Sequence, residues 1–163
     1  MDPDRLRYSA ENCSIRRTLD IVGERWTLLV LREAFYGVRR FADFHRALGC
    51  AKNLLSARLK TLVEEGVLER ERYRDPGARA RDEYRLTEKG LELFPALVAL
   101  LQWGDRYAAD SAGPPVELSH SGCGARVGVE LRCSAGHRPL SARDTAALPG
   151  PGAKLAAERT QVA

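Results

Sequence analysis

The fold of this chain is decided by Lys52-Asn53-Leu54-Leu55-Ser56-Ala57-Arg58-Leu59-Lys60-Thr61-Leu62, a stretch that runs through Gly66 into an arginine-rich segment. Leu55, Leu59 and Leu62 stand at positions i, i+4 and i+7, so they share one apolar stripe of a helix. The side chains that point away from this stripe are polar or basic, namely Lys52, Asn53, Ser56, Lys60 and Thr61. The pattern predicts an amphipathic helix whose outer face is built to contact another molecule.

Three apolar patterns precede this helix. Ser14 to Val22 has apolar residues at helical spacing and is followed by Gly23, which marks a helix end. Trp26 to Phe35 is apolar on all sides, which is typical of a central core helix. A stripe from Phe41 to Leu48 predicts a short third helix that ends at Gly49. A short helix, a tight turn and a second helix together predict a helix-turn-helix.

The segment after Gly66 predicts a β-hairpin. Residues 67–74 mostly alternate between apolar or aromatic and charged side chains, and Asp75-Pro76-Gly77 supplies the turn. Glu83-Tyr84-Arg85-Leu86 returns as the partner strand. A recognition helix followed by a basic hairpin is the arrangement of a winged helix. The expected fold class is therefore mainly α with a small β-hairpin wing, that is, α+β.

A last long helix is expected from Glu88 to about Tyr107, with Thr87 as its N-cap. Pro95 should kink or divide this helix, because proline lacks a donor N–H and clashes with the preceding turn. The apolar residues of the helix cover more than one face, and a chain of this size has only a small core to offer them. The surplus predicts a partner subunit.

These elements define a domain organisation. Residues 1–112 are expected to form a winged helix-turn-helix DNA-binding domain that includes a dimerisation helix at about 87–110. Gly113-Pro114-Pro115 is a breaker and a linker. Residues 113–147 are expected to form a small Cys- and His-containing hairpin appendage. Residues 148–163 are rich in Ala, Gly and Pro and are expected to form a flexible tail.

Composition bounds the function. The chain has 163 residues, 44% of them hydrophobic, which excludes wholesale disorder, and its charge of +4 permits a polyanionic partner without requiring one. No apolar run follows Met1-Asp2-Pro3-Asp4-Arg5, and no stretch reaches the roughly 18 apolar residues of a membrane span. We therefore expect a cytoplasmic protein that does not engage a membrane. In such a protein, four cysteines favour free thiols, metal ligands or redox switches over a disulfide scaffold.

Several motifs occur in order between Cys13 and Gly104. They are Cys13-Ser14-Ile15, Leu19-Asp20-Ile21-Val22-Gly23-Glu24-Arg25-Trp26-Thr27-Leu28-Leu29-Val30-Leu31-Arg32-Glu33, Arg40-Phe41, Asn53-Leu54-Leu55-Ser56-Ala57-Arg58-Leu59-Lys60-Thr61-Leu62, Tyr84-Arg85-Leu86-Thr87-Glu88-Lys89-Gly90 and Trp103-Gly104. In these motifs and their spacing the chain resembles the HxlR-type winged helix-turn-helix transcription regulators. The resemblance implies a homodimer joined largely through its terminal helices, with two recognition helices in successive major grooves of double-stranded DNA and wings on the flanking backbone. It also implies regulation of a nearby operon.

The candidate base-reading residues lie at the start of the recognition helix. Side chains there reach base edges, so Lys52, Asn53 and Ser56 are expected to read sequence. Arg58 and Lys60 lie farther along, where they either contact phosphate or pair within the chain.

Two further groups of arginines are candidates for phosphate contacts. Arg39 and Arg40 precede the helix that begins at Phe41, where they either bind phosphate beside its N-terminal amides or are ordinary surface charges. On the hairpin, sequence-independent attraction is expected from Arg72, Arg74, Arg79 and Arg81. One tip arginine can enter the minor groove, and Arg72 or Arg74 can instead pair with Glu83.

Two cysteines are candidate redox sensors. The resemblance places Cys13 where some relatives keep a thiol that senses oxidants or electrophiles. Arg16 and Arg17 and the nearby helix N-terminus would favour its thiolate, although a cysteine there can also simply pack. Cys50 precedes the recognition helix, where oxidation would affect DNA contact.

The tail carries a candidate zinc site. His120, Cys123, Cys133 and His137 have the ligand types and number of a tetrahedral site. Their spacing is uncommon, and Cys133-Ser134-Ala135-Gly136-His137 departs from the Cys-x-x-Cys hairpin that often ends relatives. A metal-free hairpin is therefore the default, and no cofactor is expected.

The sequence favours a regulator that binds DNA. We expect a homodimeric, sequence-specific repressor whose affinity is changed by thiol oxidation or by a small molecule bound near the dimer interface. The alternative is a protein-interaction module with a metal-held tail, because winged helices also serve as scaffolds. No nucleophile elbow, phosphate loop or His-Glu-x-x-His helix is present to indicate an enzyme.

Overall fold

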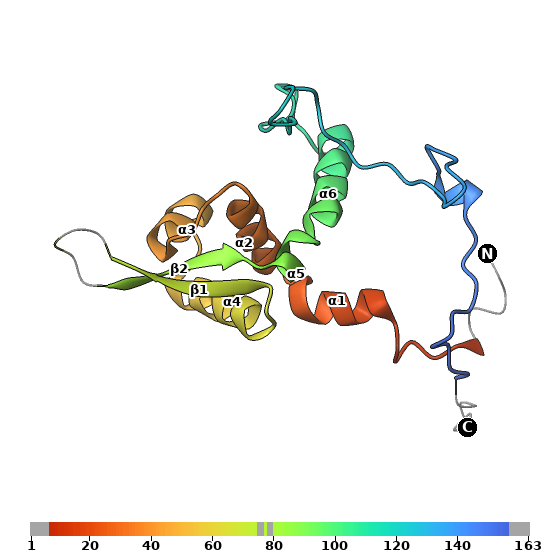
Figure 1. Cartoon of the computed structure of the whole chain (residues 1–163), viewed down its shortest axis with the longest axis horizontal. Coiled ribbons are helices and arrows are strands. Elements are labelled where there is room, and N and C mark those ends of the chain that lie inside the picture. The colour runs from red at the N-terminus through yellow and green to blue at the C-terminus, as the bar shows by residue number, and fades with distance from the viewer. Residues whose placement is uncertain (1–6, 75–76, 78–79, 157–163) are drawn as a thin grey trace. The chain divides into compact units, whose positions relative to one another are not determined.

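The structure is a computed structural model that describes residues 7–74, 77 and 80–156 (Figure 1). The chain divides into two compact units. Glu24–Val129 form the first, called the winged unit below. Met1–Gly23 and Glu130–Ala163 form the second, called the terminal unit.

The winged unit has the element order expected of a winged helix-turn-helix. Its elements are α2 (Arg25–Phe35), α3 (Phe41–Leu48), α4 (Lys52–Glu64), β1 (Leu68–Tyr73), β2 (Arg81–Leu86), α5 (Glu88–Leu91) and α6 (Phe94–Tyr107). Gly49 ends α3 with a φ of 62°, a conformation that glycine adopts without steric cost. The predicted α+β fold class is confirmed.

The core of the winged unit forms where α2, α3 and α4 meet the hairpin (Figure 1). Leu55, Leu59 and Leu62 of α4 are all fully buried, as their spacing predicts. They pack in a core to which α2 contributes Val30 and Leu31. Burying a leucine side chain contributes about 1.5–3 kcal/mol, so this stripe fixes which face of α4 is left for solvent.

The wing is an antiparallel pair of strands, β1 and β2, in a register that runs from Leu68↔Leu86 to Tyr73↔Arg81. The backbone N–H of Tyr84 also donates to the carbonyl oxygen of Arg39 at 2.8 Å. The segment before α3 therefore lies against the other edge of β2, and the helix-turn-helix and the wing are joined through their backbones.

Pro95 divides the last helix, as predicted. The first piece, α5, is capped by Thr87, whose side-chain oxygen accepts from the backbone N–H of Gly90 at 3.1 Å. Pro95 lies in the first turn of α6. Backbone N–H groups in the first turn have no acceptor within the helix, so a proline there costs no helical hydrogen bond. The division changes the direction of the chain between the wing and α6.

In the terminal unit, α1 (Ser14–Val22) is accompanied by the 3-10 turn η2 (Ala142–Asp144). Tyr8 and Leu155 form an isolated antiparallel bridge. The Ser141 hydroxyl donates to the Asp144 carboxylate at 2.6 Å, and this bond lowers the Asp144 pKa. None of the helices in the described part of the chain is long and apolar enough to cross a membrane.

Candidate DNA-binding surface

The outer face of α4 presents the predicted base readers. Lys52, Asn53 and Ser56 are all exposed in the first turns of the helix. Ala51 occupies the N-cap and provides no side-chain cap, and the first turn contains no acidic residue. The first backbone N–H groups and the adjacent lysine therefore present positive electrostatic potential, which suits a phosphate or a base acceptor.

The two cations farther along α4 differ in their surroundings. Lys60 is exposed and lies 3.6 Å from Glu64 one turn away. Arg58 is half-buried, with one terminal nitrogen 3.9 Å from the Glu24 carboxylate. Its Nε is buried without a hydrogen-bond partner among the residues that the structure describes. The structure contains the pair with Glu24, and a phosphate contact of Arg58 stays a prediction.

Arg39 and Arg40 lie between the helix-turn-helix and the wing. Arg40 is the N-cap residue of α3, and its guanidinium carbon lies 4.3 Å from the centroid of the Tyr73 ring on β1. Arg39 is exposed and its carbonyl oxygen accepts from Tyr84. The Arg40 side chain and the Arg39 backbone thus lie at the edge shared by the start of α3 and the hairpin.

The wing carries ion pairs near its base and exposed arginines nearer its tip. Near the base, Arg85 donates to Glu71 at 2.7 Å and to Glu83 at 2.6 Å, and its hydrogen bond to the Glu83 carboxylate raises the Arg85 pKa. Nearer the tip, Arg72, Arg74 and Arg81 are exposed. Arg79 lies outside the described residues. Glu83 accepts a hydrogen bond from Arg85, and the predicted pairing of Glu83 with Arg72 or Arg74 stays a prediction.

A second surface of the winged unit is apolar. Leu100, Trp103 and Tyr107 of α6 share one helical face and are exposed by 55%, 62% and 65% of their areas. The Trp103 and Tyr107 rings contact each other, with centroids 5.4 Å apart. These three residues are called the α6 stripe below. Exposed apolar stripes of this kind are typical of protein interfaces.

A family model described as HxlR-like helix-turn-helix matches residues 21–112, more than half of the chain. The chain belongs to the HxlR-like helix-turn-helix family. This finding agrees with the resemblance carried by the sequence motifs.

Relatives and solved structures extend the match. Rv3095, an uncharacterised HTH-type transcriptional regulator of Mycobacterium tuberculosis, is 49% identical over 154 residues, which cover 93% of this chain and 96% of that protein. The crystal structure of PA1607, a proposed transcription factor, is 40% identical, with a TM-score of 0.76 over 86% of this chain and 96% of that one. The redox regulator HypR in its oxidised form is 28% identical, with a TM-score of 0.54, and covers 60% of this chain and 100% of HypR.

The two candidate sensor thiols of this HxlR-family chain differ in access. Cys13 is half-buried at the N-cap of α1 and lines a cavity of about 800 Å³ within the terminal unit, together with Ser9 and Asn12. Cys50, just before α4, is buried with 6% of its area exposed. A reagent in solution therefore reaches Cys13 more readily.

The candidate zinc ligands occur as two pairs. His120 Nδ1 lies 3.2 Å from Cys123 Sγ in the winged unit, and Cys133 Sγ lies 3.4 Å from His137 Nδ1 in the terminal unit. Within residues 7–74, 77 and 80–156, no group of three or more potential metal ligands forms. Each unit on its own holds fewer ligands than the four of a structural zinc site. A four-ligand site stays a prediction.

Sequence reasoning missed the contact between Arg40 and Tyr73. The alternation of β1 places Tyr73 on the same face as Glu69 and Glu71, and this pattern does not identify Arg40 as the residue that contacts Tyr73. The motif Arg40-Phe41 and the aromatic residue at the end of the strand were visible separately. Their proximity depends on how the segment before α3 pairs with β2, which is a tertiary contact.

Proposed function

We propose that this chain is a homodimeric, sequence-specific transcriptional repressor that binds operator DNA through α4 and the wing. One observation carries the proposal: a single compact unit exposes a polar α4 face and wing arginines on its DNA-binding elements and an apolar stripe on its last helix. The first surface suits DNA and the second suits another copy of the chain. Membership of the HxlR-like family supports the same assignment.

The roles divide between specificity and affinity. Asn53 has the side chain that pairs bidentately with adenine, and Lys52 can reach guanine O6 and N7. Ser56 can contact either base type. Arg39, Arg40 and the exposed wing arginines bind phosphate and add affinity that does not depend on sequence. Arg58 acts within the fold, through Glu24.

The dimer places two recognition helices on one face of the duplex. Two copies related by a twofold axis would read half-sites one helical turn apart, about 34–36 Å. The α6 stripe supplies the apolar contact that such a dimer needs, since Leu100, Trp103 and Tyr107 otherwise remain in water.

The proposal also includes a signal that makes the protein release DNA. Oxidation at Cys13, or a small molecule bound near the dimer interface, would change the operator affinity. The accessibility of Cys13 in the terminal unit supports the first route, as does the likeness to HypR, which is a redox regulator.

A gel-shift titration against the DNA upstream of the protein's own gene tests the assignment. Replacement of both Lys52 and Asn53 by Ala should remove about 10-fold or more of the preference for that DNA over unrelated DNA, since each lost base contact is worth about 1–3 kcal/mol. The matched control is Glu65→Ala at the exposed C-terminal end of α4, which should keep the preference.

Two outcomes would contradict the proposal. Unchanged selectivity in the double variant would remove α4 as the reading helix. Absence of salt-sensitive, selective binding by the wild-type protein would favour the protein-interaction module instead. The direction of regulation is measured with a reporter fused to the same upstream DNA, whose transcription should rise when the gene is deleted.

A further inference from the structure

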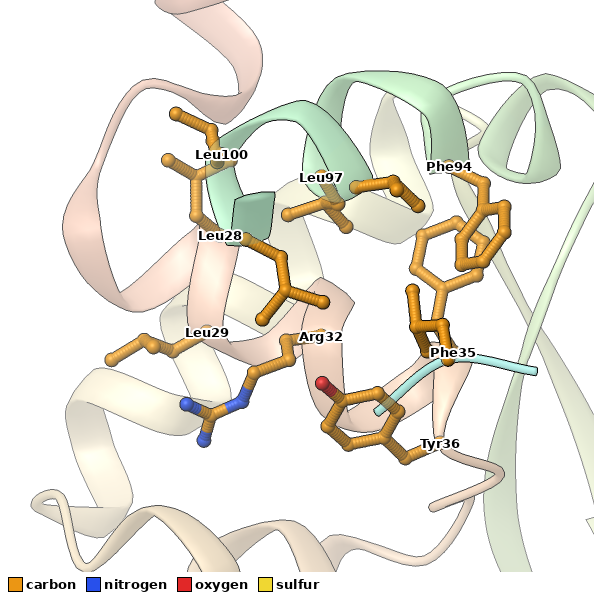
Figure 2. A pocket seen from close by; sticks show the side chains of 11 residues that line it. Leu28, Leu29, Arg32, Phe35, Tyr36, Phe94, Leu97 and Leu100 are labelled. Carbon is orange, nitrogen blue, oxygen red and sulfur yellow. The ribbon is translucent and has the colours of Figure 1, made fainter. Parts of the chain in front are cut away.

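A cavity of about 230 Å³ lies inside the winged unit between α2 and α6 (Figure 2). Leu28 and Phe35 line it from α2, and Phe94, Leu97 and Leu101 line it from α6. Leu118, from the segment after α6, also lines it. Three separate segments of one unit therefore line the space, and Leu100 is the residue that it shares with the α6 stripe.

The lining contains one polar group that faces inward. Figure 2 shows the Tyr36 hydroxyl directed toward the space between Arg32 and Leu28. This hydroxyl has no hydrogen-bond partner within the part of the chain that the structure describes. An otherwise apolar pocket with one oriented hydroxyl selects a ligand that is apolar except for one oxygen.

The charge balance argues against an anionic ligand. Arg32 also lines the pocket, but its Nε donates to the Glu33 carboxylate at 2.8 Å, and a terminal nitrogen of Arg32 contacts the same oxygen. Glu33 is buried, so this ion pair is not easily separated. The guanidinium points away from Phe35 and Phe94 in Figure 2. The pocket therefore offers a hydroxyl that is available to bond a ligand, and a guanidinium whose charge is already paired, which together suit a neutral ligand.

The size and walls suit an aromatic ligand. A dry apolar cavity of about 150 Å³ holds benzene in another protein, so about 230 Å³ leaves room for a fused two-ring molecule. The Phe35 and Phe94 rings form one wall, with centroids 5.0 Å apart and planes tilted by 42°. Tilted aromatic walls of this kind attract a third ring through edge-to-face contacts.

We propose that this pocket binds a small neutral aromatic molecule with one hydroxyl group, and that its binding changes operator affinity. The second part rests on the proposed function. The mechanism follows from the position of the pocket. Helix α2 packs against both α4 and α6, and α6 carries the α6 stripe, which is the proposed dimer surface. Leu100 belongs both to the pocket and to that stripe. A ligand between α2 and α6 would shift the dimer helix relative to the recognition helix and so change the spacing of the two α4 helices.

Direct binding is measured by fluorescence titration of the full-length protein with 2-naphthol, and naphthalene serves as the probe that lacks the hydroxyl. Tyr36→Phe should weaken the binding of 2-naphthol about threefold to tenfold, which corresponds to the loss of one net hydrogen bond. The same substitution should leave the affinity for naphthalene unchanged. Tyr73→Phe is the matched control, since it removes a phenol hydroxyl at the end of β1, outside the pocket, and the titration contains no DNA.

A second pair of variants fills the pocket. Leu97→Trp should abolish binding of both probes, and Leu101→Phe provides the same test with a smaller change if the tryptophan variant does not fold. Equal affinity of 2-naphthol for the wild type, Tyr36→Phe and a folded filled variant would overturn the proposal. Binding that weakens as protein concentration rises would also overturn it, because a side chain of a second copy would then be the occupant.

The effect of the ligand on operator affinity is tested in a separate measurement. Saturating 2-naphthol should change the operator affinity of the wild type by at least threefold and leave a folded pocket-filled variant unchanged. If 2-naphthol binds with the expected variant pattern but does not change operator affinity, the regulatory part fails. The fluorescence titration contains no DNA, so the pocket is tested even if selective operator binding, and with it the proposed function, fails.

Discussion

The guanidinium of Arg40 lies over the ring of Tyr73, with 4.3 Å between the guanidinium carbon and the ring centroid. Arg40 begins the first helix of the helix-turn-helix and Tyr73 ends the first strand of the wing. This cation–π contact therefore ties the two DNA-facing elements together and directs a positive charge to the edge between them.

Replacement of Tyr73 by Ala should weaken DNA binding about two- to fivefold for all sequences, because an exposed cation–π contact is worth about 0.5–1 kcal/mol. Tyr73→Phe keeps the ring and should bind as the wild type does. The measurement is a titration of specific and unrelated DNA at one fixed salt concentration. Wild-type affinity in Tyr73→Ala would mean that the contact does not position Arg40 for DNA.

The exposed wing arginines should contribute to the salt dependence of binding. Replacement of both Arg72 and Arg81 by Ala should reduce the slope of log affinity against log salt by about 1.8, since each lost phosphate contact accounts for about 0.9. Selectivity between sequences should change little. The double variant Arg126→Ala, Arg138→Ala is the charge-matched control, because both arginines are exposed and pair with acidic residues outside the wing, Glu117 and Glu130. An unchanged slope in the double variant would exclude these arginines as phosphate ligands.

Gly90 should tolerate no side chain. A Cβ at this position would lie 2.2 Å from the carbonyl oxygen of Val67, a backbone atom that cannot move aside without disturbing the wing. Gly90→Ala should therefore lower the free energy of unfolding by about 1–3 kcal/mol, as overpacked positions do. Chemical denaturation measures the change, and the exposed neighbour Glu92 gives the control Glu92→Ala, with an expected effect within about 0.5 kcal/mol. Equal stability of the two variants would contradict this packing.

Local patterns in the sequence predict the elements of this fold because their causes are local. The spacing of Leu55, Leu59 and Leu62 predicts a buried helical stripe, and all three are fully buried. The donor that proline lacks predicts the division of the last helix at Pro95, and Thr87 caps the piece before it. Each of these predictions depends on residues within two or three turns of one another.

The contacts that sequence reasoning left open depend on residues far apart in the chain. From the sequence alone, Arg58 can contact either a DNA phosphate or an acidic residue of the chain. Its acidic neighbour, Glu24, caps another helix, and the distance between the two cannot be read from their spacing in the sequence. The bridge between Tyr8 and Leu155 joins segments from the two ends of the chain, and no local pattern marks it. Such pairings are decided by tertiary packing, which one sequence does not specify position by position.

Cys13 should react before Cys50. Cys13 is half-buried beside a cavity, whereas Cys50 is buried, so N-ethylmaleimide should label Cys13 faster in the native protein. If Cys13 is the sensor, mild peroxide should reduce operator binding of the wild type and of Cys50→Ser but not of Cys13→Ser. Mass spectrometry identifies the labelled thiol. Loss of binding in Cys13→Ser on the same oxidation would assign the response to another residue.

The α6 stripe should hold the dimer together. Trp103→Glu places a charge in the centre of the apolar face, between Leu100 and Tyr107, and burial of an unpaired carboxylate in an interface is strongly unfavourable. Sedimentation velocity at micromolar concentration should therefore find the wild type as a dimer and Trp103→Glu as a monomer. Operator affinity should fall when dimerisation is lost, because a monomer contacts only one half-site.

Gln102→Glu is the matched control for this substitution. It adds the same charge on another face of α6, and its side chain keeps an oxygen to accept from the backbone N–H of Val129, as Gln102 does at 2.8 Å. The control should remain a dimer and bind operator DNA normally. If Trp103→Glu stays dimeric while folded, the interface lies elsewhere on the chain. If Gln102→Glu also becomes a monomer, general repulsion rather than the apolar stripe would explain the result, so the two variants together decide which surface of α6 forms the dimer.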